Sequence, residues 1–146
     1  MSTFAIAEPS FNHPMLSSRL ISELSRARST LRATTERNGP VVIVSAGGEL
    51  DASNEAVWRR LLNEAAAAAS APGPLVVDTS GLDFMACCAY AALGEEAERC
   101  RRRGVDMRLV SNQPAVSRIL AACGLSELLP VEHSVDAALS ASALVD

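Results

Sequence analysis

The sequence predicts an α/β domain, a mixed β-sheet flanked by helices. Short β-branched apolar runs alternate with longer segments whose apolar residues recur every three or four positions, a pattern typical of strands joined by helical crossovers. Glycine and proline separate most of these segments. The chain has 146 residues, of which 49% are apolar and 21% charged. That length and composition indicate one globular domain with a core of its own.

Residues 1–29 are predicted to form a leader that precedes the domain proper at residues 30–146. Within residues 15–31, Leu20, Leu24, Ala27 and Leu31 recur at steps of four, three and four. This spacing places them on one face of an amphipathic helix. We expect that face to pack on the domain, or else to contact a partner or a second copy of the chain.

A hairpin is predicted next. Residues 30–36 form a candidate strand that overlaps the end of the helix. A turn is predicted at Arg37-Asn38-Gly39-Pro40, because Asn-Gly readily adopts positive φ. Residues 41–46 are a β-branched run typical of a buried strand. We expect Gly47-Gly48 to end that strand and residues 49–51 to follow as a loop.

The rest of the chain continues the alternation. A helix over residues 54–69 should stop at Pro72-Gly73-Pro74, and a short strand over residues 75–78 should lead into a loop over residues 79–86. The remaining predicted elements are a helix over 87–103 ended by Gly104, a strand over 105–110, a helix opened by Asn112 and Pro114 and ended by Gly124, a strand over 128–131 and a helix over 134–143 capped by Ser134. The inward stripes of the two middle helices are Tyr90, Leu93, Ala97 and Cys100, and Val116, Ile119, Leu120 and Cys123.

The carboxyl ends of the strands are where ligands or partners usually meet such sheets. Here those ends carry residues 48–51, 78–88 and 111–115. Asp51, Asp78 and Asp83 could together bind a hard cation, but helix capping and loop hydrogen bonds account for them better. The chain has no phosphate-binding glycine motif, and we expect neither a metal nor a cofactor.

Four cysteines raise the question of thiol chemistry. Cys87 and Cys88 open a predicted helix, where the dipole and free amides stabilise a thiolate, so at least one should be unusually reactive. No histidine is placed to act as their base, and the spacing does not fit zinc. We expect any intramolecular disulfide to join Cys100 to Cys123, both near helix ends.

Charge excludes some partners. The thirteen basic residues are all arginine, and with seventeen acidic residues the net charge is −4, which gives no electrostatic case for DNA binding. The cluster Arg99, Arg101, Arg102 and Arg103 is interpreted as a solvated helix end. No apolar run is long enough to cross a bilayer, so a cytoplasmic protein is expected.

The order of several motifs resembles a STAS domain of the anti-sigma factor antagonist family. They are Gly48-Glu49-Leu50-Asp51, Asp78-Thr79-Ser80-Gly81-Leu82-Asp83-Phe84, and Val116-x-x-Ile119-Leu120-x-x-x-Gly124-Leu125. The resemblance covers roughly residues 30–143. It implies a bacterial, non-enzymatic protein that binds an anti-sigma factor, usually a serine kinase of the histidine-kinase ATPase type, and so frees a sigma factor.

The resemblance also implies where the partner binds. Phosphorylation of a serine at the start of the central helix breaks the complex in this family, because the added charge disfavours a packed interface. The implied contact residues are Glu49, Asp51, Asn54, Ala86, Cys87, Cys88, Ala89 and Tyr90.

The sequence departs from the family at that serine. Family members read Asp-Ser-Ser-Gly-Leu where this chain reads Ala86-Cys87-Cys88-Ala89-Tyr90, so Cys88 stands at the phosphoacceptor position. A serine kinase cannot phosphorylate a thiol there. Three alternatives to the antagonist stay open: a redox sensor using Cys87, Cys88, Cys100 and Cys123, a small-molecule or nucleotide binder at the strand ends, and a cysteine-dependent enzyme.

Overall fold

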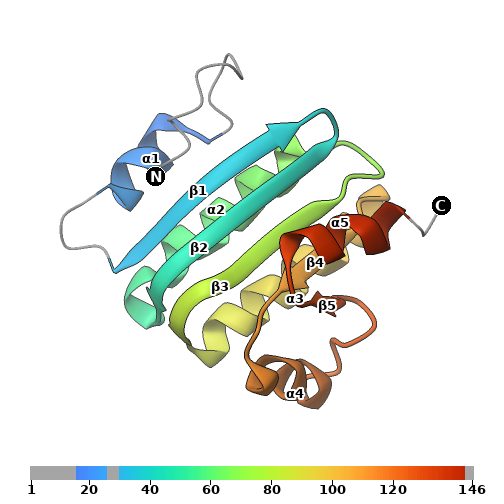
Figure 1. Ribbon diagram of the computed structural model, residues 1–146. Helices are drawn as coiled ribbons and strands as arrows, with labels where there is room; N and C mark the ends of the chain where they lie inside the picture. Colours follow the sequence, from blue (N-terminus) through green and yellow to red (C-terminus); the bar gives the residue numbers. More distant parts are fainter. Residues whose placement is uncertain (1–15, 26–29, 144–146) are drawn as a thin grey trace.

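The computed structural model describes residues 16–25 and 30–143, and in them a mixed five-stranded sheet carries helices on both faces (Figure 1). The strands lie in the order β1-β2-β3-β4-β5, with β1 and β2 antiparallel and every later pair parallel. The predicted α/β class is therefore confirmed. The elements are α1 (Ser18–Leu24), β1 (Leu31–Asn38), β2 (Val41–Leu50), the 3-10 turn η3 (Ala52–Asn54), α2 (Glu55–Ala68), β3 (Leu75–Met85), α3 (Cys87–Arg103), β4 (Met107–Val110), α4 (Pro114–Ala122), β5 (Val131–Glu132) and α5 (Val135–Ala143).

Helices α2 and α3 cover one face of the sheet, and α5 covers β3 and β4 on the other (Figure 1). The main core lies between the sheet and the first pair, and a smaller cluster around Val76, Val110 and Ala138 lies beneath α5. The predicted helix over residues 87–103 and its inward stripe are confirmed, since Tyr90, Leu93, Ala97 and Cys100 are all buried. Gly104 ends that helix with a φ of 78°.

The two central strands are longer than predicted. Strand β2 runs through Gly47-Gly48 to Leu50, and β3 continues to Met85, so the expected break and the expected loop at residues 79–86 are wrong. Register shifts flank the glycine pair, which marks a bulge. Gly48 has a φ of 95°, and a Cβ there would lie 1.9 Å from the Thr30 carbonyl oxygen. The glycines thus let neighbouring backbones approach closely and keep the strand paired.

Helix α1 packs on α2. Its predicted stripe holds for Leu20 and Leu24, which are buried, whereas Leu31 belongs to β1 and Ala27 lies outside the described residues. Glu23 pairs with Arg60, and the hydroxyl of Ser17 donates to Glu64 at 2.9 Å. The described part of the expected leader therefore contributes apolar residues to the main core.

Helix α4 lies at the end of the sheet, so only a narrow side of it is covered (Figure 1). Val116 and Leu120 are buried as expected, but Ile119 and Cys123 are exposed, which corrects the predicted stripe. The helix begins after Gln113 and not after Asn112. Strand β5 is also shorter and later than predicted.

One arginine of the basic cluster has a structural role. The guanidinium of Arg103 donates to the carbonyl oxygens of Ala66 and Ala69, at 2.7 and 3.0 Å, and so caps the end of α2. Arg101 and Arg102 pair with Glu98, in line with the predicted solvated helix end.

Candidate functional site

Two segments far apart in sequence meet at the carboxyl edge of the sheet. The end of β2 lies beside the end of β3, and the N–H of Ala86 donates to the carbonyl oxygen of Leu50 at 2.9 Å. This bond holds the loop after β2 next to the first turn of α3. The sequence placed residues 48–51 and 78–88 at strand ends, and the structure brings the ends of these two segments together.

The loop after β2 is fixed by a capping box at the start of the helical segment. Ser53 donates through its hydroxyl and its N–H to Asp51 Oδ1, at 2.6 and 3.0 Å, and the N–H of Asp51 donates to Asn54 Oδ1 at 3.0 Å. The Asn54 amide also donates to the Glu49 carbonyl oxygen at 2.9 Å. Asn54 is buried and shapes this loop, while the Glu49 side chain points to solvent.

The charge of Asp51 is stabilised by the same box. Hydrogen bonds from Ser53, first from its hydroxyl and then from its N–H, lower the pKa of Asp51 below its usual range. Asp51 therefore stays ionised at the surface and can pair with a cationic group of a partner.

The first turn of α3 presents different side chains to different sides. Cys87 is exposed and Cys88 half-buried, whereas Ala89 and Tyr90 lie in the core. Ala86 precedes the helix in an extended conformation, and its side chain supplies no capping bond. Of the residues implied as contacts in this turn, Cys87 is the one that is exposed.

Cys88 does not have the activated thiol that its place at a helix start predicted. Burial raises its pKa, and so does the negative charge of Glu55, which opposes the stabilising N–H groups of the first turn. A raised pKa disfavours the thiolate of Cys88, and the expectation that at least one of the two thiols is unusually reactive stays a prediction. The first cause of the raised pKa is burial, and the second is the acidic side chain that α2 brings against the thiol.

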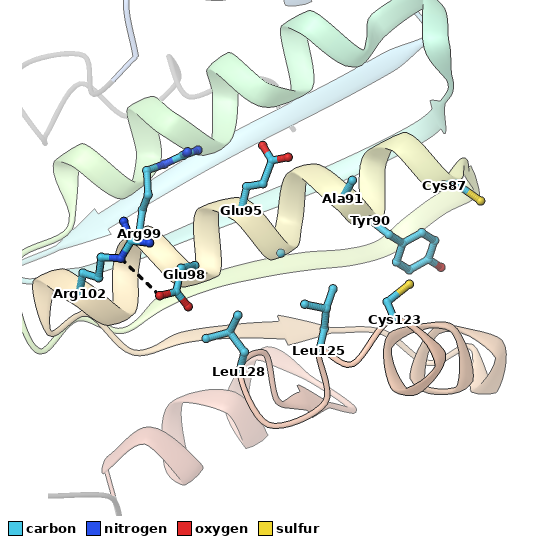
Figure 2. A pocket seen from close by; sticks show the side chains of 11 residues that line it. Cys87, Tyr90, Ala91, Glu95, Glu98, Arg99, Arg102, Cys123, Leu125 and Leu128 are labelled. Carbon is cyan, nitrogen blue, oxygen red and sulfur yellow. Dashed lines mark hydrogen bonds and ion pairs between the residues drawn. The ribbon is translucent and has the colours of Figure 1, made fainter.

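Cys123 lies beside the start of α3 and not beside its end. It lines a cavity of about 630 Å³ with Cys87 and Tyr90 (Figure 2). Burial raises the pKa of Tyr90, and the negative charges of the Cys87 and Cys123 thiolates raise it further. Cys100 lies ten residues after Tyr90 on the same helix, about 15 Å along its axis. A disulfide needs Cα atoms within about 7 Å, so the expected Cys100–Cys123 pairing is wrong.

The carboxylates considered as ligands of a hard cation do not assemble a metal site in the described part of the chain. No group of three or more histidine, cysteine or acidic residues in the described part of the chain could hold a metal ion. Asp78 accepts a hydrogen bond from the Ser80 N–H at 2.9 Å, which is the loop role considered for it. Among residues 16–25 and 30–143, no helix has the length and apolar character needed to cross a membrane.

One residue of this edge was missed by sequence reasoning. Phe84 stands near the end of β3 with 54% of its surface exposed. The sequence placed it in a loop, where an apolar side chain has no assigned direction. A prediction that the strand continues through residue 84 would have assigned this side chain to one side of the sheet, because successive residues of a strand point to opposite faces.

Comparison with known proteins agrees with this architecture. The family model of the STAS domain matches residues 32–138. A Mycobacterium tuberculosis protein named as an anti-anti-sigma factor, Rv2638, is 59% identical over 127 residues, covering 87% of this chain and 85% of that protein. The anti-sigma-F factor antagonist RsfA of Mycobacterium tuberculosis is 55% identical over 114 residues, covering 78% and 89%.

A solved structure leads to the same family. The crystal structure of an anti-sigma factor antagonist from Mycobacterium paratuberculosis superposes with a TM-score of 0.68 at 26% identity, covering 82% of this chain and 99% of that one. The fold, the family match and the relatives agree, and the chain belongs to the STAS domain family, among the anti-sigma factor antagonists.

Proposed function

We propose that this chain binds an anti-sigma factor in the bacterial cytoplasm and thereby releases a sigma factor, acting as a binding module and not as an enzyme. The observation that carries the proposal is the bond from the Ala86 N–H to the Leu50 carbonyl oxygen, which sets the Asp51 loop beside the start of α3. The names of the relatives support the same activity. The partner expected from the family resemblance is an ATPase of the serine-kinase type.

The thiol at position 88 removes the usual control of this activity. A kinase partner would meet Cys88 where family members carry a serine, and the acidic Glu55 beside it. A second negative group there would also be repelled by Glu55. We expect the chain to bind its partner without being switched off by phosphorylation at this position.

Binding of a purified anti-sigma factor tests the proposal directly. The probe is the anti-sigma-F factor of Mycobacterium tuberculosis, titrated by calorimetry with the full chain, and release of its sigma factor is followed by size-exclusion chromatography. Asp51→Lys should weaken binding at least about tenfold, because a reversed charge at a docking surface is costly. No binding and no sigma factor release by the wild-type chain would refute the proposal.

A matched control keeps the Asp51 result specific. Glu36→Lys makes the same charge reversal on an exposed residue of β1, near the hairpin at the far end of β2. We expect this variant to bind like the wild type. Equal weakening by both variants would indicate a general electrostatic effect and would remove Asp51 from the site.

A second candidate function is thiol-based control of the same surface, favoured by one observation. Cys87 and Cys123 are both exposed and line one cavity at the start of α3. A hydroperoxide would oxidise one thiolate to a sulfenic acid and leave as the alcohol or water. The second thiol would then attack that sulfur, forming the S–S bond and releasing water.

Peptide mapping after mild oxidation tests this candidate. Treatment with a small excess of hydrogen peroxide should yield an intramolecular Cys87–Cys123 crosslink, and partner affinity should fall until a thiol reductant restores it. Cys100→Ala is the control, since that thiol is buried with its pKa raised to about 11 and should stay reduced. A crosslink that leaves affinity unchanged, or no crosslink at all, would exclude redox control at this surface.

A further inference from the structure

Phe84 is a large apolar side chain that the core of the protein does not cover. It is one of two large apolar side chains that are substantially exposed in the described part of the chain, at 54%, the other being Ile119 at 36%. Its neighbours Leu82 and Met85 are the residues of this segment that contact the core. The aromatic ring therefore contributes little to the packing of the fold.

Carboxylates neighbour Phe84 along the two paired strands. Glu49 is the register partner of Phe84 in the pairing of β2 with β3, and Asp83 precedes it in the chain. Both side chains are exposed, and neither forms an ion pair with another described residue. Asp51 adds a third charge directly after β2, and the guanidinium of Arg32 lies over Gly47.

This arrangement has the anatomy of a binding hot spot. Aromatic side chains that enter a desolvated pocket supply much of the binding energy of protein interfaces, and polar residues around them form the rim. Here the rim is acidic, so a partner with basic side chains around the pocket would gain both complementary charge and a faster encounter.

We propose that Phe84 is the apolar anchor by which this protein docks on its anti-sigma factor, and that it enters an apolar pocket edged by arginine or lysine side chains. This inference rests on the proposed function and deepens it. The acidic patch formed by Glu49, Asp51 and Asp83 pairs with that basic edge, and Phe84 fills the pocket at its centre.

Two truncations separate anchoring from folding. Phe84→Ala should weaken affinity for the purified anti-sigma-F factor at least about tenfold, the loss typical of an interface hot spot. Ile119→Ala removes the other exposed apolar side chain, on α4, and should change affinity less than about twofold. The urea midpoint of Phe84→Ala should stay close to that of the wild type.

Salt dependence tests the chemistry of the pocket edge. Affinity of the wild type should fall between 50 mM and 300 mM sodium chloride, and the double variant Glu49→Gln, Asp83→Asn should bind more weakly and show a smaller salt effect. An affinity that does not depend on salt would contradict the proposal that basic side chains of the partner surround the pocket.

The outcomes distinguish this inference from the proposed function. If the wild type binds and Asp51→Lys weakens it while Phe84→Ala binds normally, the function stands and the anchor is wrong. If the wild type does not bind, the proposed function fails and the anchor with it. If the wild type self-associates and Phe84→Ala restores a monomer without affecting the anti-sigma factor, the ring docks on a second copy of the chain and the inference is overturned.

Discussion

The indole nitrogen of Trp58 donates a hydrogen bond to the carbonyl oxygen of Ala89 at 3.2 Å. Both residues are buried, Trp58 in α2 and Ala89 in the first turn of α3. The bond ties the helix that follows the Asp51 loop to the turn that holds Cys87 and Cys88. The two halves of the site are thus joined through the core as well as along the sheet edge.

Removing this donor should loosen that connection. Trp58→Phe is expected to lower the free energy of unfolding by about 1–3 kcal/mol, because a hydrogen bond is lost and the smaller ring leaves space in the core. Urea unfolding followed by circular dichroism gives the value, since Trp58 is the only tryptophan and the variant loses its fluorescence. A change below about 0.5 kcal/mol would show that the bond adds little to stability.

The glycine bulge gives a prediction with an internal control. Gly48 and Gly39 both have positive φ, at 95° and 63°, but only at Gly48 would a Cβ meet another backbone. Gly39→Ala should cost about 1–2 kcal/mol from conformation alone. Gly48→Ala should cost about 3 kcal/mol or more, because the new methyl group also clashes with the Thr30 carbonyl oxygen.

Thermal and urea unfolding of both variants check this difference. Equal costs for the two substitutions would contradict this close approach, since they would mean that the backbone of Thr30, directly before β1, is not packed against Gly48. An unfolded Gly48→Ala protein beside a folded Gly39→Ala protein agrees with it.

The uncapped start of α3 leaves room for a stabilising substitution. Ala86 has the extended conformation of an N-cap residue but no side-chain oxygen for the free N–H groups of the first turn. Ala86→Ser should raise the free energy of unfolding by about 1 kcal/mol. Ala91→Ser, at an exposed position within α3, is the control and should be neutral or slightly destabilising, and a stabilisation no larger than this control would contradict the missing cap.

The depressed pKa of Asp51 predicts an acid-dependent contribution to stability. A carboxylate whose folded pKa lies below its unfolded value stabilises the fold above the unfolded pKa of about 4, and this contribution is lost as the pH falls through the folded pKa. Asp51→Asn keeps a capping side chain without the titration. The stability difference between wild type and variant should be constant above about pH 5 and shrink below pH 4.

Nuclear magnetic resonance titration checks the cause of that depression. Ser53→Ala removes the hydroxyl that contributes most to the depression, so the Asp51 pKa should move back toward its ordinary value. An unchanged Asp51 pKa in this variant would assign the effect to the backbone N–H groups alone.

Local patterns along the chain predict the features that depend on neighbouring residues. Helix α3 begins at Cys87 and ends before Gly104 as the periodicity predicted, and the Asn38-Gly39 turn joins β1 to β2. Local spacing suffices for these features, because a helix face, a cap or a tight turn is built from residues a few positions apart. The resemblance to a STAS domain rests on the order of motifs along the chain, which can be read without knowing any tertiary contact.

Contacts between segments that are distant in sequence account for the features that local patterns did not predict. A Cβ at position 48 would meet the Thr30 backbone, and burial together with Glu55 from α2 raises the pKa of Cys88 against the effect of the helix start. Cys123 lines the same cavity as Cys87 because α4 lies at the end of the sheet, and Phe84 belongs to β3 because that strand extends past its predicted end. Each outcome depends on contacts between segments brought together by folding, and no local pattern in the sequence encodes those distances.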